Sequence, residues 1–104
     1  MEEMTQEREA KILERAINTY GAYAQVDMAI EEMAELTKAL LKHRRALESK
    51  KTTGDGFMQA VSAVLEEMAD VGIMLNQLAL IFGDCNEQEI AKLERLERRL
   101  SGDV

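Results

Sequence analysis

The chain has 104 residues and a formal net charge of −7, with 46% hydrophobic and 32% charged residues. This length suits a single core, so we expect one domain over residues 1–104. The negative charge argues against general binding to nucleic acid backbones and favours a cation site or an enzyme acting on small molecules. With no proline and 4% aromatic residues, the chain should form long helices and no strands.

Several features favour a cytoplasmic protein that does not contact membranes. The one cysteine, Cys85, cannot form an internal disulfide, which fits a reducing compartment. The first residues, Met1 to Met4, lack the basic and apolar regions of a signal peptide. No apolar run approaches the ~20 residues that a transmembrane helix requires.

Two helices are predicted in the first half of the chain. The first, over residues 5–20, carries an amphipathic stripe that includes Leu13 and Ile17, and Gly21 interrupts it. The second should cover residues 22–49, before a loop over residues 50–56 that is rich in threonine and glycine. The predicted core face of this second helix consists of Val26, Ile30, Met33, Ala34, Thr37, Leu40 and Leu41.

A third helix is predicted over residues 57–82, and it is apolar on more than one side. Its expected core row consists of Phe57, Val61, Val64, Met68, Val71, Leu75, Leu78 and Phe82. Met74 and Ile81 fall outside this row, and a small monomer rarely leaves a continuous apolar stripe uncovered. We therefore expect a second chain to cover Met74 and Ile81, in a homodimer or a dimer of dimers.

Gly83 is expected to end the third helix, and a fourth should follow over residues 87–101. Its apolar residues, Ile90, Leu93, Leu96 and Leu100, share one face. The predicted fold is therefore an all-α four-helix bundle that dimerises or tetramerises through its long helices.

Two acidic segments are nearly identical: Glu31-Glu32-Met33-Ala34-Glu35 and Glu66-Glu67-Met68-Ala69-Asp70. Residues three apart share a helical face, so each segment presents two carboxylates on one side. If the two helices pack antiparallel, four carboxylates converge, and they repel one another unless a hard cation lies among them. Oxygen ligands of this kind suit Mg²⁺ or Mn²⁺.

Two other interpretations explain the acidic segments less well. A di-iron site needs Glu-x-x-His pairs, whereas the one histidine, His43, has Leu40 three residues before it. Either segment alone would be explained by a solvated helix face. The duplication in similar apolar surroundings favours the metal site.

Glu32-x-x-Glu35 followed by Glu67-x-x-Asp70 resembles the ExxE…ExxD signature of the all-α nucleoside triphosphate pyrophosphohydrolases. These include MazG-like proteins, dimeric dUTPases and phosphoribosyl-ATP pyrophosphohydrolase, and the similarity over residues 16–82 is strongest to MazG-like segments. The resemblance implies Mg²⁺-dependent cleavage of a nucleoside triphosphate between the α and β phosphates. It also implies that these four carboxylates are the metal ligands, with Glu35 as a candidate general base.

A triphosphate also needs positive groups. Lys38 follows Glu35 by one turn, and Lys92 and Arg95 belong to a basic run in the last helix that is similar to one in MazG-like chains. The alternative is that this run balances the glutamates of an exposed helix. Gln25 is a candidate for binding the base, with stacking by Tyr20, Tyr23 or Phe57; core packing is the alternative for Phe57.

The sequence leaves a competing function of another class, a non-catalytic helical interaction module whose acidic segments are surface charge. Such a module would be indifferent to Mg²⁺. Among enzymes, hydrolysis of phosphoribosyl-ATP is a second option, and the sequence does not decide which base or sugar is preferred.

Overall fold

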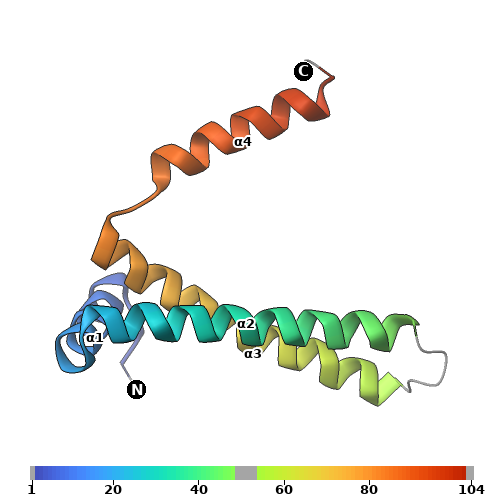
Figure 1. Cartoon of the computed structure of the whole chain (residues 1–104), viewed down its shortest axis with the longest axis horizontal. Helices are drawn as coiled ribbons and strands as arrows, with labels where there is room; N and C mark the ends of the chain where they lie inside the picture. Colours follow the sequence, from blue (N-terminus) through green and yellow to red (C-terminus); the bar gives the residue numbers. More distant parts are fainter. Residues whose placement is uncertain (1, 49–53, 103–104) are drawn as a thin grey trace.

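The computed structural model describes residues 2–48 and 54–102, with Asp55 described by its backbone alone. Over these residues the chain is all helical, without strands (Figure 1). The helices are α1 (Gln6–Tyr20), α2 (Ala22–Glu48), α3 (Gly54–Phe82) and α4 (Asn86–Leu100). The all-α prediction is confirmed. Most of the predicted loop over residues 50–56 lies outside the described residues.

Capping residues explain where α1 begins and ends. At its start the Thr5 hydroxyl accepts a hydrogen bond of 3.0 Å from the Arg8 backbone N–H, and Glu7 and Glu9 in the first turn suit the positive end of the helix dipole. At its end Gly21 has a φ of 95°, and its N–H donates to the Ile17 carbonyl at 2.8 Å. Glycine tolerates this φ, so one residue is enough to turn the chain into α2.

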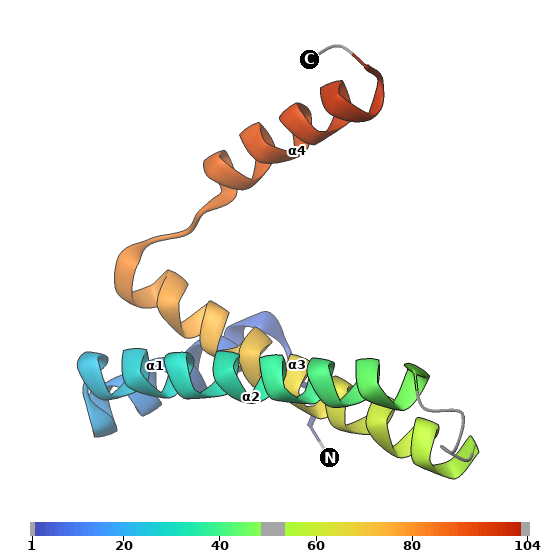
Figure 2. The same ribbon diagram turned by 45° about the vertical axis from the view of Figure 1, so that its right-hand side comes forward.

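The body of the molecule is an antiparallel pair, α2 and α3, with α1 packed against one end (Figures 1 and 2). Most tertiary contacts join α2 to α3, and α1 contacts both. Asn76 on α3 donates a hydrogen bond of 2.7 Å from Nδ2 to Oε1 of Glu9 on α1. This body is the scaffold that holds the two acidic segments side by side.

The residues through which α2 and α3 contact each other form one row on each helix. The row on α2 differs entirely from the predicted core row, and the row on α3 differs in part. The contact row of α2 consists of Gln25, Ala29, Glu32, Leu36, Ala39, His43 and Ala46, all buried or half-buried. The contact row of α3 consists of Phe57, Ala60, Val64, Glu67, Val71, Met74, Leu78 and Ile81, again buried or half-buried. The His43 and Phe57 rings pack with their centroids 5.3 Å apart, so both side chains contribute to the contact between α2 and α3.

The predicted core face of α2 is therefore wrong by one position. Ile30, Met33 and Leu40 are 61%, 38% and 46% exposed, whereas Ala29 is 1% exposed. The prediction took the most apolar row as the core, but apart from Leu36 the row that meets α3 is built from small and polar residues. A single chain leaves the most apolar row of α2 open.

The prediction for α3 is correct for part of its row: Phe57, Val64, Val71 and Leu78 are half-buried and face α2. Met74, expected to be covered by a second chain, is 7% exposed within one chain, and Ile81 is half-buried. Met68, Leu75 and Phe82, expected in the core, are exposed. Because α3 is apolar on more than one side, periodicity could not decide which side meets α2.

The fourth helix stands apart from the body, which corrects the predicted four-helix bundle. In the described part of the chain α4 contacts no other helix, and all of its residues are exposed (Figure 2). Gly83, with a φ of 108°, ends α3, and the short connection through Cys85 leads α4 away. Over the described residues, none of the helices has the length and apolar composition needed to cross a bilayer.

Candidate metal centre

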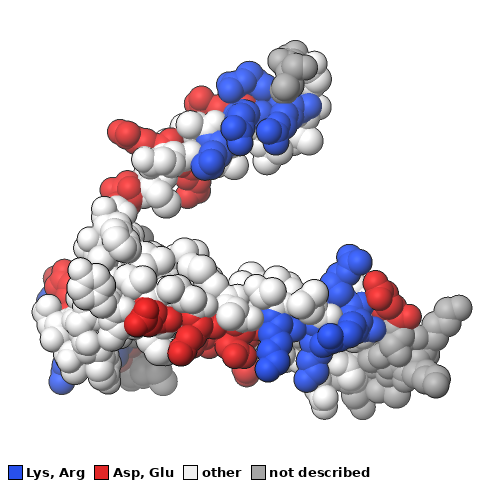
Figure 3. Space-filling model, in the orientation of Figure 1, with Lys and Arg blue, Asp and Glu red and all other residues white. Residues whose placement is uncertain are grey.

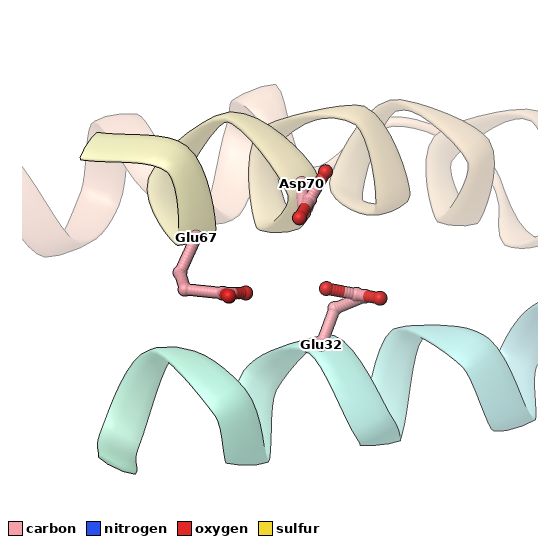
Figure 4. A group of neighbouring side chains, drawn as sticks. All are labelled: Glu32, Glu67 and Asp70. Carbon is pink, nitrogen blue, oxygen red and sulfur yellow. The ribbon is translucent and has the colours of Figure 1, made fainter. Parts of the chain in front are cut away.

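Three carboxylates from the two acidic segments converge between α2 and α3. Glu32, Glu67 and Asp70 each offer one oxygen, and these three oxygens all lie within 4.8 Å of one another. Figure 4 shows the Glu32 side chain rising from α2 and those of Glu67 and Asp70 extending from α3 toward the same space. Glu67 and Asp70 share a side because they are about one turn apart, and the antiparallel pairing brings Glu32 opposite them.

The electrostatics of this triad oppose full ionisation. Partial burial is the largest cause that raises the pKa of Glu32, followed by the charges of Asp70 and Glu67. A hydrogen bond with Asp70 and the charge of Glu35 act in the same direction. The ion pairs of the described residues lie elsewhere, within α1 and within α2, so no lysine or arginine neutralises the triad there.

One oxygen of the triad also lacks a partner. Oε2 of Glu67 is buried and accepts no hydrogen bond from the described residues. A buried carboxylate oxygen without a donor is costly, and native proteins rarely leave one unsatisfied. A divalent cation between α2 and α3 would satisfy this oxygen and remove the repulsion among the carboxylates.

The raised pKa of Glu32 predicts a pH-dependent effect of Glu32→Gln in protein freed of divalent cations. A raised pKa means that the folded state holds the proton more tightly than the unfolded chain does, for which the ordinary value is 4.5. The stabilisation from this group is complete below pH 4.5 and is lost as the pH rises through the raised pKa. At pH 7 Glu32→Gln should therefore melt at a higher temperature than the wild type.

Melting curves between pH 4 and pH 8 check this expectation. The advantage of Glu32→Gln should shrink toward the acid end, and Glu31→Gln, at the exposed neighbouring position, should show no such trend. A Glu32→Gln protein that is less stable at pH 7 than the wild type would mean that the triad does not strain the metal-free fold.

The fourth predicted ligand, Glu35, does not join the triad. It lies one turn beyond Glu32 on α2 with its side chain exposed, although its charge still acts on Glu32. Lys38, one turn further, is exposed as well. Glu31 and Glu66, whose roles the sequence left open, both face solvent.

Lys92 and Arg95, two of the three basic residues predicted to bind substrate, lie on α4. Lys92 and Arg95 line a shallow groove of about 310 Å³ along α4. Because α4 contacts no other helix among the described residues, the structure does not bring these cations to Glu32.

Gln25 lies in a position that suits a binding role. It is 7% exposed and lines an open groove of about 550 Å³, together with Tyr20 and Met28. It precedes Glu32 by seven residues, which places it on the same face of α2, roughly 10 Å along the helix. Tyr23, another stacking candidate, is 90% exposed.

Gln77 is a polar residue that the sequence analysis missed. It is 3% exposed, and its Oε1 accepts no hydrogen bond from the described residues. It follows Asp70 by seven residues, as Gln25 precedes Glu32 by seven, so the antiparallel pairing that brings Glu32 to Asp70 also brings Gln25 level with Gln77. This matched spacing is the signal that could have identified it.

Comparisons with known proteins add no relative. A scan against protein-family models finds no match, and neither do searches of the curated proteins and of the solved structures. The functional argument therefore depends on the chain's own residues and on the similarity of its two acidic motifs to a known signature.

Proposed function

We propose that this protein is a Mg²⁺-dependent nucleoside triphosphate pyrophosphohydrolase that releases a nucleoside monophosphate and pyrophosphate. The observation that carries the proposal is the convergence of Glu32, Glu67 and Asp70, within 4.8 Å, from two helices. A cluster of carboxylates can hold an anionic triphosphate only through a cation, and Mg²⁺ commonly bridges carboxylates and phosphates. The order Glu-x-x-Glu…Glu-x-x-Asp, similar to that of the MazG-like enzymes, supports this substrate class.

The proposed chemistry assigns a role to each acidic residue. Glu32, Glu67 and Asp70 bind Mg²⁺, with Mn²⁺ as a substitute, and the ion supplies neutralisation of the phosphate charge and a more acidic water. Glu35 is exposed one turn beyond Glu32, and its charge acts on Glu32; it is assigned to accept the proton of the water that attacks phosphorus. Lys38, one turn beyond Glu35, is assigned to the phosphates farther from the metal.

The groove beside Gln25 is assigned to the base and sugar of the nucleotide. Its lining is mainly apolar, as is common for small-molecule sites, and the amide of Gln25 supplies both a donor and an acceptor. At roughly 10 Å from Glu32 along α2, Gln25 is within reach of a nucleotide whose phosphates bind at the metal. Lys92 and Arg95 have no role at the site of their own chain in this proposal.

The proposal includes a homo-oligomer in the cytoplasm, acting on nucleotide pools. A screen for pyrophosphate release in Mg²⁺, across the common and chemically damaged nucleoside triphosphates, tests the activity. The second candidate function is a non-catalytic interaction module, which is favoured by the open apolar rows of α2 and α3 and by the unpartnered α4. A protein that releases no pyrophosphate, and whose melting temperature does not change with Mg²⁺, would favour the interaction module.

A further inference from the structure

The triad opens to solvent on one side of the α2–α3 pair. Asp70 is its exposed member, whereas Glu32 and Glu67 are half-buried between the helices. Asp70 on α3 and Glu35 on α2 each directly precede a member of the row through which the two helices contact each other. Antiparallel helices are related by a two-fold axis perpendicular to their plane, so the residues that precede the two contact rows come out on the same side. This surface is called here the triad side.

The charges on the triad side of α2 change sign along the helix. Its charged residues are Glu31, Glu35, Lys38, Lys42 and Arg45. Figure 3 shows acidic side chains along the middle of the body and basic ones further toward the carboxyl end of α2. Within the described part of the chain none of these three cations pairs with a carboxylate, since the ion pairs there involve Lys11 and Arg44. Unpaired cations in line with a metal-binding type of triad suit a ligand with several negative charges.

A small cavity lies beside the second of these cations. It has a volume of about 170 Å³ and is lined by Lys42, Ala46, Gly56, Gln59, Ala60 and Ala63. The alanine side chains are too short to fill the space between the helices. Lys42 and Gln59 bring an ammonium group and an amide to its lining, and both groups donate hydrogen bonds. The cavity is therefore polar enough to take part of an anionic ligand.

The cavity and the groove beside Gln25 lie in opposite directions from the triad. Gln25 precedes Glu32 by seven residues, whereas Lys38 and Lys42 follow it by six and ten. These separations correspond to roughly 9 Å for Lys38 and 15 Å for Lys42 along α2. Helical side chains incline toward the amino end of their helix, so the lysine side chains incline back toward the triad. A nucleotide with its base beside Gln25 and its phosphates at the triad would extend its terminal phosphates toward Lys42.

We propose that Lys42, together with Lys38, binds the β- and γ-phosphates of the substrate and then the pyrophosphate formed from them. The inference rests on the proposed function and adds the direction in which the substrate lies along the pair of helices. In the reaction, water is added across the P–O bond between the α- and β-phosphates, and its surplus proton passes to Glu35. The Lys42 ammonium keeps its own protons and donates hydrogen bonds to the pyrophosphate half, whose negative charge it offsets.

Inhibition by the two products tests this assignment with the variants Lys42→Met and Arg44→Met. Each variant removes one positive charge near the end of α2, but Arg44 lies on the opposite side of the helix from Lys42. Lys42→Met should raise the KM for the triphosphate and the inhibition constant of pyrophosphate by about tenfold each. Its inhibition by the nucleoside monophosphate, which lacks the β- and γ-phosphates, should stay within about twofold of the wild type. Arg44→Met should leave all three constants near their wild-type values.

Calorimetry with pyrophosphate in Mg²⁺ measures the same contact without hydrolysis. The wild type and Arg44→Met should bind pyrophosphate equally, and Lys42→Met should bind it about tenfold more weakly. Lys42→Arg should recover most of the lost affinity, because it retains a positive charge and donors for phosphate. A lysine that only supported the packing of α2 would not show this recovery.

Three results would overturn the proposal. A wild type that does not bind pyrophosphate in Mg²⁺ would remove the subsite. Wild-type binding and inhibition in Lys42→Met would place the terminal phosphates elsewhere. Equal weakening of pyrophosphate and of the nucleoside monophosphate in Lys42→Met would reduce the lysine to a general charge effect. Failure of the proposed function gives a different pattern, in which no triphosphate is hydrolysed although pyrophosphate binding still depends on Lys42; that pattern would support the phosphate subsite alone.

Discussion

Glu67→Gln is expected to lower the rate of pyrophosphate release by a factor on the order of 10³, while the helical circular dichroism remains. Glutamine preserves the shape of the side chain but removes the negative charge that would bind the cation. Oε2 of Glu67 is the triad oxygen that is buried without a hydrogen-bond partner, so its contribution to metal binding should be large. Asp70→Asn should act in the same direction.

The neighbouring glutamate provides a matched control. Glu66 precedes Glu67 on the same helix, carries the same charge and faces solvent. Glu66→Gln should keep the rate within about threefold of the wild type, since an exposed charge outside the triad contributes little. Full activity in Glu67→Gln and in Asp70→Asn would show that the triad has no role in catalysis. The acidic segments would then be ordinary solvent-exposed helix surface.

Millimolar Mg²⁺ or Mn²⁺ should raise the melting temperature of the wild type. An ion at ten times its dissociation constant stabilises the folded state by about 1.4 kcal/mol, which corresponds to roughly 5–10 °C for a domain of this size. Binding relieves the repulsion of Glu32 by Asp70 and Glu67 in the metal-free protein, and this relief contributes to the affinity for the ion. Thermal melts at constant ionic strength, with Na⁺ in place of the divalent ion, separate binding from general screening.

Glu67→Gln provides the second control for this experiment. Its melting temperature should respond to Mg²⁺ less than that of the wild type, and Glu66→Gln should respond as the wild type does. Equal shifts in all three proteins would mean that the divalent ion acts elsewhere on the acidic surface.

The sequence predicted the helices well because their signals are local. Gly21 and Gly83 have the positive φ that ends a helix, and both were recognised as breaks. The convergence of Glu32, Glu67 and Asp70 could be anticipated, since a spacing of three residues fixes which carboxylates share a face. Glu35 is not part of this group, and its side chain is exposed.

The sequence could not predict which faces of α2 and α3 meet. Each helix carries two adjacent rows at helical spacing. The prediction took the more apolar row of α2, which includes Ile30, as the core, and for α3 it mixed residues of both rows, such as Val64 and Met68. In the structure the row of α2 that includes Ala29 meets α3, and its small residues allow close approach. The large apolar residues that the prediction placed in the core, such as Ile30 and Met68, are exposed in a single chain.

The sequence could not predict the orientation of α4 either. Its row of Ile90, Leu93, Leu96 and Leu100 predicts a covered face but does not name the surface that covers it. The connection after Gly83 directs α4 away from the body, and that direction depends on backbone geometry that residue periodicity does not contain.

Analysis of the products with Mg²⁺ and with a chelator tests the central claim most directly. Each hydrolysed triphosphate should yield one nucleoside monophosphate and one pyrophosphate in Mg²⁺, and no products should form in excess chelator. Restoring Mg²⁺ should restore both products in the wild type and in Glu66→Gln, but not in Glu67→Gln. Nucleoside diphosphate and inorganic phosphate as products, or equal rates with and without Mg²⁺, would contradict the proposed function.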